Sequence, residues 1–528
     1  MATTSQNYVI GENDLGLPHY LVELDEYHLK EFEQFSSMCS LDEYEQLLYT
    51  LENKFLHKTV PVPPSDGIII MLTLATASPH YKDQFIKAND PYNVGRADIT
   101  KRCMRLLLQL VRLVESFDSE KYNVYDLELL RCQLFLVLDH INPKRLLVPI
   151  SKRVRTHHGN KLSSIPFSDG EMSLDNTSNL RTNYTYISVL ETKTTVFQNP
   201  LITHVLSQNG GFWNFVGWAL SSEIDEDLVK NYCGETWLPI VSFLFSLYDL
   251  RQEYFKHCEM GKELSSLEYA NRLSKSPLVS LFKSLGSKEI HVALCDAIFI
   301  NCGEGIGNGE GRPVYHSELN LSANYIPIHK GSVSYRLQKS MRYRRRILAS
   351  YFKVLADIPV DQRIRPFSEE QSIKHLVRTL VKLETVEMFQ EFFYADDLHT
   401  NMHYLPLLAE RIVIDLWEDC GKIIELALSS NLGNLDLTIE ECEKILDGRP
   451  QDCANDLGLN KTTVYLDTCT LVLLKYAVML HGDGITKSSK LKHLAQEVIR
   501  EESELVSKSS IDESYPSIAP YLNSIFQL

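Results

Sequence analysis

The sequence predicts an all-α fold, with irregular multi-helix packing in two or three helical subdomains and two long flexible loops between them. Three observations predict it. Apolar residues recur at three- and four-residue spacing along most of the 528-residue chain, which is the period of a helix with one buried face. Strand-like segments do not alternate with these helices, so a parallel sheet is not expected. The sequence has no repeat of fixed length, so the helices are not expected to stack as a solenoid.

The clearest element is a helical hairpin in the N-terminal part of the chain. Asp98 is the expected N-cap of its first helix, because a short carboxylate accepts hydrogen bonds from free amides of the first turn. A break follows at Asp118 and Ser119, and the second helix stops near Asn142, before Pro143. The short connection predicts antiparallel helices. Their apolar faces are Ile99, Cys103, Leu106, Leu107, Leu110, Leu113, Val114 and Phe117, then Leu127, Leu130, Leu134, Val137, Leu138 and Ile141.

The hairpin belongs to a first predicted helical subdomain, residues 1–150. This subdomain opens with a strand-like or loop piece, His19–Leu24. Ser40 and Glu43 have the spacing of a capping box, in which each side chain bonds the other residue's end amide. The helices expected before the hairpin run from this box to about Phe55 and, after a proline-rich turn, from about Ile68 to Ala88.

A predicted flexible loop, residues 151–182, separates the first subdomain from a middle helical subdomain, residues 183–301. The loop is rich in Ser, Asn, Thr and Gly and cannot bury much apolar surface. All four tryptophans of the chain are expected in the core or in a partner groove, with the core as the default. They are Trp213, Trp218, Trp237 and Trp417. The helices expected in the middle subdomain begin at Trp213, at Trp237 (through Phe255) and at Pro277 (through Leu285).

A second flexible loop, rich in glycine, is predicted at residues 302–334. Its alternating glycines suggest a phosphate-binding loop, but Asn308 and Glu310 interrupt the Gly-x-Gly-x-x-Gly spacing and no Gly-Lys-Ser/Thr follows. Glu304 and Glu310 would also repel a phosphate. We therefore favour a flexible linker.

The C-terminal helical subdomain, residues 335–528, is predicted to consist of successive helices. They are expected at Gln338–Asp357, Glu369–Tyr394, His403–Ser429, Ile439–Leu446, Asn460–His481 and Ser488–Lys508.

Composition indicates a soluble protein of a reducing compartment. The chain is 44% apolar and 23% charged, and its net charge of −16 argues against a wide DNA-binding surface. Its eleven cysteines include no Cys-x-x-Cys pair, which favours free thiols. No signal peptide is evident, and the apolar run Gly67–Ala77 is too short to span a bilayer. We expect a nuclear or cytoplasmic protein without a membrane partner.

The strongest basic cluster lies near the start of the C-terminal subdomain. On a helix its cations spread around much of the circumference. The cluster is compatible with a DNA-phosphate patch, a surface for an acidic partner, a nuclear import signal or a solvated helix face beside acidic neighbours. Its residues are Lys339, Arg342, Arg344, Arg345 and Arg346.

A second candidate site is the apolar triplet Leu21, Val22 and Leu24, which stands among acidic residues. Such a strand can add to the sheet edge of a small modifier such as SUMO, with the acids facing its basic rim. The alternative is that the triplet is packed core.

No residue pattern predicts catalysis, a cofactor or a metal. His399 and His403 have the spacing of two zinc ligands on a helix, but Thr400 stands where a metalloprotease carries glutamate and no third ligand is evident. The sequence lacks a Gly-x-Ser-x-Gly elbow and a kinase signature. We therefore expect a protein that is not an enzyme.

Several segments resemble the budding-yeast type of non-SMC element five, a subunit of the complex built on the SMC five and six ATPases. The resemblance covers most of the chain and is densest in the first subdomain. Its segments are Asn89–Arg145, Pro18–Leu24, Ser37–Cys39, Arg272–Leu278, Tyr325–Pro327 and Tyr404–Glu410.

The resemblance implies an all-helical, non-enzymatic subunit that forms an obligate heterodimer with non-SMC element six. In that family the dimer docks on SMC five and SMC six near the ATPase heads, restrains ATP hydrolysis and promotes loading onto DNA. The resemblance further implies a nuclear, chromosome-associated protein in DNA repair, with links to SUMO and the SUMO ligase subunit. DNA would be contacted indirectly through the complex. A stand-alone nucleic-acid-binding protein and a generic helical adaptor remain as alternatives.

Overall fold

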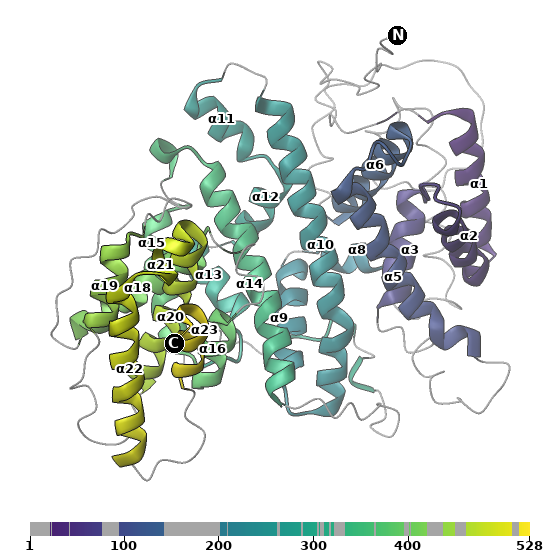
Figure 1. Ribbon diagram of the computed structural model, residues 1–528. Coiled ribbons are helices and arrows are strands. Elements are labelled where there is room, and N and C mark those ends of the chain that lie inside the picture. Colours follow the sequence, from purple (N-terminus) through teal and green to yellow (C-terminus); the bar gives the residue numbers. More distant parts are fainter. Residues whose placement is uncertain are drawn as a thin grey trace, which may run out of the picture. The chain divides into compact units, whose positions relative to one another are not determined.

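The computed structural model confirms the all-α prediction, since its regular elements are helices in all the residues that it describes (Figure 1). The described residues are Val22, 24–41, 43–76, 94–141, 201–208, 210–260, 264–286, 289–303, 306, 311–315, 318–320, 333–363, 366–394, 401, 403–419, 437–448, 461–508 and 517–527.

The chain forms two compact units that are interleaved in sequence. Unit 1 comprises residues 1–258 and 311–329, and unit 2 comprises residues 259–310 and 330–528. The chain therefore passes from one unit to the other three times. The predicted loop 151–182 lies outside the described residues, and the predicted division into three subdomains stays a prediction.

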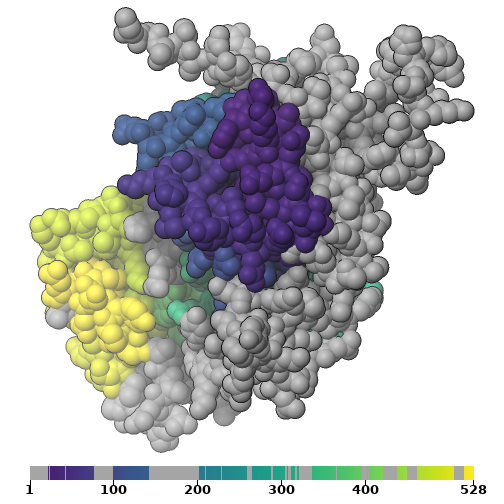
Figure 2. All heavy atoms as spheres, turned by 90° about the vertical axis from the view of Figure 1, so that its right-hand side faces the viewer, coloured from purple at the N-terminus to yellow at the C-terminus, as the bar shows by residue number. Residues whose placement is uncertain are grey.

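Unit 1 is built around α3, because each of its eleven residues is buried. Helices α1, α5, α6 and α8 pack against it. Figure 2 shows the surface of the N-terminal part of this unit in purple. The helices of unit 1 are α1 (Glu26–Ser40), α2 (Tyr44–Leu56), α3 (Ser65–Ala75), α5 (Val94–Ser116), α6 (Val124–Ile141), α8 (Ile202–Leu206), α9 (Gly211–Ile224) and α10 (Leu228–Met260, whose last residues enter unit 2), with the 3-10 turn η5 (Glu318–Asn320).

Two buried polar contacts link α6 to its neighbours in unit 1. The Ser65 amide at the start of α3 donates to Gln133 Oε1 of α6 at 2.9 Å, which satisfies an amide that lacks a partner within its own helix. Arg251 Nη1 of α10 pairs with Asp139 Oδ1 of α6 at 2.8 Å and also donates to the Phe135 carbonyl. Side chains of α6 and α10 thus bind each other through a buried ion pair.

The segment 311–329 belongs to unit 1, and the buried carboxylate of its own Glu318 binds it to two helices there. Glu318 Oε2 accepts hydrogen bonds from Trp218 Nε1 of α9 at 2.8 Å and from Trp237 Nε1 of α10 at 2.9 Å. Its Oε1 accepts the Tyr315 amide at 2.6 Å. A Cβ on Gly311 would lie 2.8 Å from Cα of Trp218, so this close approach requires glycine. Part of the segment that we expected to be a flexible loop is therefore packed.

Unit 2 is built around α20, which packs against α16, α18 and α19. Its helices are α11 (Ser266–Leu273), α12 (Pro277–Lys283), α13 (Ile290–Ile298), α14 (Val333–Asp357), α15 (Glu369–Val381), α16 (Val386–Phe393), α18 (Leu405–Asp419), α19 (Ile439–Asp447), α20 (Lys461–His481), α21 (Asp483–Thr486), α22 (Ser489–Lys508) and α23 (Ala519–Phe526), with the 3-10 turn η7 (Val360–Gln362).

Several predicted helix ends were wrong. The expected capping box does not form, because Ser40 ends α1 and α2 starts at Tyr44 without a side-chain cap. Asp98 is not an N-cap, since α5 already begins at Val94. The helix expected from about Ile68 ends at Ala75. The span Glu369–Tyr394 is two helices, because the chain turns after Val381 and Thr385 caps a new helix through the Met388 amide at 3.2 Å.

Candidate functional site

Helix α14 carries the predicted basic cluster but buries two of its five cations. Arg344 is fully buried and Arg345 is 4% exposed. Arg344 donates to the Ile298 carbonyl and, at 3.1 Å, to Ser340 Oγ. Arg345 donates to the Phe392 carbonyl at 3.2 Å. The prediction of a five-residue surface patch is corrected at these two positions, because both guanidinium groups bind main-chain carbonyls of unit 2.

Burial also affects the pKa of Arg344. Desolvation lowers the pKa of its guanidinium, while the nearby Cys302 thiol raises it. Arginine stays protonated in proteins even so, and a buried cation needs acceptors around it. Arg344 is therefore a structural residue of the core of unit 2.

The other three cations of the cluster share one side of α14. Arg342 is exposed, and Lys339 and Arg346 are half-buried. Their spacing of three and four residues places them on neighbouring turns of one helix face. A phosphate-contacting or acidic-partner role of these three residues stays a prediction.

The predicted SUMO-type contact falls on core residues where the structure describes them. Val22 and Leu24 are each 5% exposed. A main-chain hydrogen bond from Val22 lowers the pKa of Cys132 on α6, although burial outweighs it and raises that pKa to about 12. Leu21 lies outside the described residues. Val22 and Leu24 are therefore packed core residues, and their side chains are not exposed for such a contact.

The four tryptophans are buried, which confirms the core default for them. Trp237 and Trp417 are at most 2% exposed, and Trp213 and Trp218 at most 7%. Phe215 packs edge-on against Trp237, with ring centroids 5.4 Å apart.

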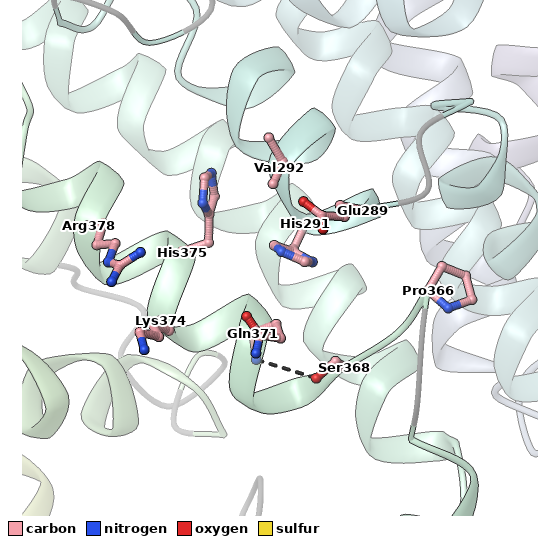
Figure 3. Close-up of a pocket in the computed structure, with 9 residues that line it drawn as sticks. All are labelled: Glu289, His291, Val292, Pro366, Ser368, Gln371, Lys374, His375 and Arg378. Atoms are coloured by element: carbon pink, nitrogen blue, oxygen red, sulfur yellow. Dashed lines mark hydrogen bonds between the residues drawn. The ribbon is translucent and has the colours of Figure 1, made fainter.

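A polar cavity of about 240 Å³ lies within unit 2, between the start of α13 and one face of α15 (Figure 3). Helix α13 contributes His291 and Val292, preceded by Glu289. Helix α15 contributes a stripe at helical spacing, and the turn before it adds Pro366 and Ser368. The stripe consists of Gln371, Lys374, His375 and Arg378.

Two histidines of the lining contact each other edge to face. The ring centroids of His291 and His375 are 5.6 Å apart and the ring planes make an angle of 66° (Figure 3). Burial lowers the pKa of His375; Asp296 raises it and Arg378 lowers it further. His375 is thus expected to be neutral near pH 7, with one ring N–H as a donor.

The sequence alone did not predict this cavity. The spacing of Lys374, His375 and Arg378 puts all three on one helix face. That signal was available in the sequence, but nothing there indicated that the start of α13, about eighty residues earlier, packs opposite.

The described residues contain no group of three or more His, Cys, Asp or Glu side chains that could bind a metal ion. His399 lies outside them. Nε2 of His403 is 3.3 Å from the Ala349 carbonyl oxygen.

Helix α20 is long and apolar enough to cross a membrane, by length and composition only. However, 67% of its most apolar window is buried within the protein. Since it packs against α16, α18, α19, α21 and α23, all in unit 2, we interpret it as a core helix.

Comparison with known proteins gives two matches. Residues 1–498 match a sequence model of the Nse5 family, described as "DNA repair proteins Nse5 and Nse6". The chain is also 33% identical over 482 residues to Non-structural maintenance of chromosome element 5 of Saccharomyces cerevisiae. That alignment covers 88% of this chain and 86% of the yeast protein.

Proposed function

Because the chain belongs to the Nse5 family of DNA repair proteins, we propose that it is a regulatory and loading subunit of the SMC five/six complex. In this role it acts in DNA repair and chromosome maintenance, in the nucleus and on chromosomes. It has no catalytic activity of its own.

The observation that carries the proposal is the extent of the family match. It covers residues 1–498, which include all of unit 1 and most of unit 2. A match confined to one unit would have supported only a shared module. The proposal therefore concerns the whole chain.

The chain acts as a heterodimer with non-SMC element six. The family description names Nse5 and Nse6 together, which favours this pairing. The dimer contacts SMC five and SMC six and reaches DNA through them. Contacts with SUMO or the SUMO ligase subunit belong to the same proposal, but the burial of Val22 and Leu24 directs them to another surface.

The dimer restrains the SMC ATPase by a conformational mechanism. A bound subunit shifts the equilibrium between two arrangements of the ATPase heads only by the difference in its affinity for them. If the dimer prefers the arrangement in which the ATPase heads are not engaged, it lowers ATP turnover and favours an open ring that can be loaded.

The experiment is an ATPase titration of reconstituted SMC five and six with the purified dimer. We expect turnover to fall and to reach a plateau at one dimer per complex. Turnover that does not change would contradict the restraint, and ATP hydrolysis by the dimer alone would contradict a non-enzymatic role.

A second candidate function, direct DNA contact, is favoured by the shared face of Lys339, Arg342 and Arg346 on α14. Reversing all three to glutamate should lower the salt dependence of DNA affinity by about one unit of log–log slope per lost phosphate contact. Unchanged salt-dependent affinity in this variant would exclude the contact.

A further inference from the structure

The cavity between α13 and α15 has a chemistry that the proposed function does not use. Its lining is rich in hydrogen-bond donors: Lys374, Arg378, His291, His375 and Gln371. Glu289 is the carboxylate of the lining. Lys374 and Arg378 outnumber the single carboxylate, so the lining has a net positive charge in a chain whose net charge is −16. A concave site with a net charge concentrates ions of the opposite sign.

The two cations stand where an anion in the cavity can reach both. Lys374 and Arg378 are four residues apart on α15 and exposed, so their side chains extend from the same face. In Figure 3, Lys374 and Arg378 lie to one side of His375 and His291 lies to the other. An arginine fork binds phosphate oxygens in pairs, and a lysine adds a point charge.

The size of the cavity limits what can fill it. Its volume of about 240 Å³ is below the roughly 300–1,000 Å³ of sites that enclose drug-sized ligands. A single projecting side chain with a charged head fits such a space. Duplex DNA instead presents a continuous row of phosphates and requires a wide cationic surface. The apolar walls, Val292 and Pro366, suit the flanking residues of a peptide.

We propose that this cavity is a docking site for a phosphorylated serine or threonine of a partner protein. A phosphorylated side chain carries nearly two negative charges and three acceptor oxygens, which match the cations and donors of Lys374, Arg378, His375 and His291. Docking depends on phosphorylation of the partner and leaves this chain chemically unchanged.

The test uses the full-length chain and a degenerate peptide library with one fixed phosphoserine between randomised positions. The same library with serine serves as the reference. Fluorescence polarisation of the labelled libraries should show binding of the phosphoserine library only. Equal binding of both libraries would overturn the proposal.

The matched variants locate the binding. Lys374→Glu with Arg378→Glu should weaken binding about tenfold or more, because both phosphate-facing cations are reversed. Lys275→Glu with Arg500→Glu reverses one exposed lysine and one exposed arginine elsewhere in unit 2 and should bind as the parent does. All four positions are exposed, so both variants should keep the parent's thermal unfolding midpoint.

Two further outcomes would overturn the proposal. If the variant Lys374→Glu with Arg378→Glu, the cavity variant, binds the phosphoserine library like the parent, the phosphate is bound elsewhere. If a 20-base-pair DNA duplex displaces the phosphopeptide library from the parent but no longer binds the cavity variant, the cavity is a DNA-backbone site instead.

Discussion

Buried charged side chains hold elements together in both units. Glu318 joins two helices of unit 1 to a segment that returns from unit 2, and Arg344 and Arg345 join α14 to carbonyls of unit 2. A buried charge costs free energy unless hydrogen bonds compensate for it. These residues are therefore more sensitive to substitution than the exposed charges beside them.

Glu318→Gln should destabilise unit 1. Glutamine offers one acceptor oxygen and places an amide N–H₂ against groups that also donate, so at least one of the three hydrogen bonds is lost. We expect a loss of roughly 1.5–3 kcal/mol in the free energy of unfolding, as for hydrogen bonds to charged groups. Urea denaturation measures it, with exposed Glu120→Gln as the control. Equal stability of the two variants would contradict the role of Glu318.

Glu410 should make unit 2 less stable as the pH rises from 4.5 to about 8. Burial raises the pKa of this carboxyl from 4.5 to about 8, the neighbouring Glu441 adds to the rise, and Arg411 opposes it. The folded state then holds a proton that the unfolded chain releases above pH 4.5. The contribution of Glu410 to the free energy of unfolding is therefore largest below pH 4.5. It decreases as the pH rises and levels off above about pH 8.

Glu410→Gln tests this dependence, because glutamine resembles the protonated acid and cannot ionise. The variant should gain stability relative to the parent as pH rises from 5 to 8, by up to about 1.4 kcal/mol per pH unit. The measurement is urea denaturation at several pH values. If the difference in unfolding free energy between variant and parent is the same at every pH, Glu410 does not hold the proton.

At the scale of the helix, periodicity in the sequence predicted many of the helical segments but none of the short helices α8, α11, α13, α21 and α23. Spacing is a local property, so the helices ending at Asp357, His481 and Lys508 were predicted with nearly their observed ends. The first residues of helices were less predictable, because tertiary packing can override the preference of a capping residue. Helix α2 begins without a side-chain cap, and Ser40, the expected cap, belongs to α1. Helix α1 was missed altogether.

Which face of a helix lies inward could not be predicted for α14. Arg342 and Arg344 look alike in the sequence, and the main-chain carbonyls that accept from Arg344 and Arg345 lie 46 or 47 residues away. The cavity of His291 and His375 was unpredictable for the same reason, since it needs two helices that are distant in the chain. Contacts of this kind are set by tertiary packing.

The two faces of α14 should respond differently to charge reversal. Arg344→Glu places an acceptor among carbonyl oxygens and should cost at least about 3 kcal/mol of unfolding free energy. Arg342→Glu lies in solvent and should stay within about 0.5 kcal/mol of the parent. Denaturant unfolding of both variants measures the difference. Equal effects would contradict the burial of Arg344.

At the scale of the whole molecule, the chain crosses between its two units three times, so neither unit is a continuous stretch of sequence. The sequence predicted subdomains in linear order, because composition reveals loops but not the return of residues 311–329 to unit 1. The family resemblance, in contrast, was visible in short segments. The comparisons confirm it over most of the chain.

The most direct test of the central claim is purification of the tagged full-length chain from nuclear extract, with nuclease added, followed by quantitative mass spectrometry. Nuclease removes partners that are held only through DNA. We predict stoichiometric recovery of non-SMC element six with SMC five and SMC six. Recovery of the chain without any SMC subunit would contradict the account and would favour a helical adaptor outside this complex.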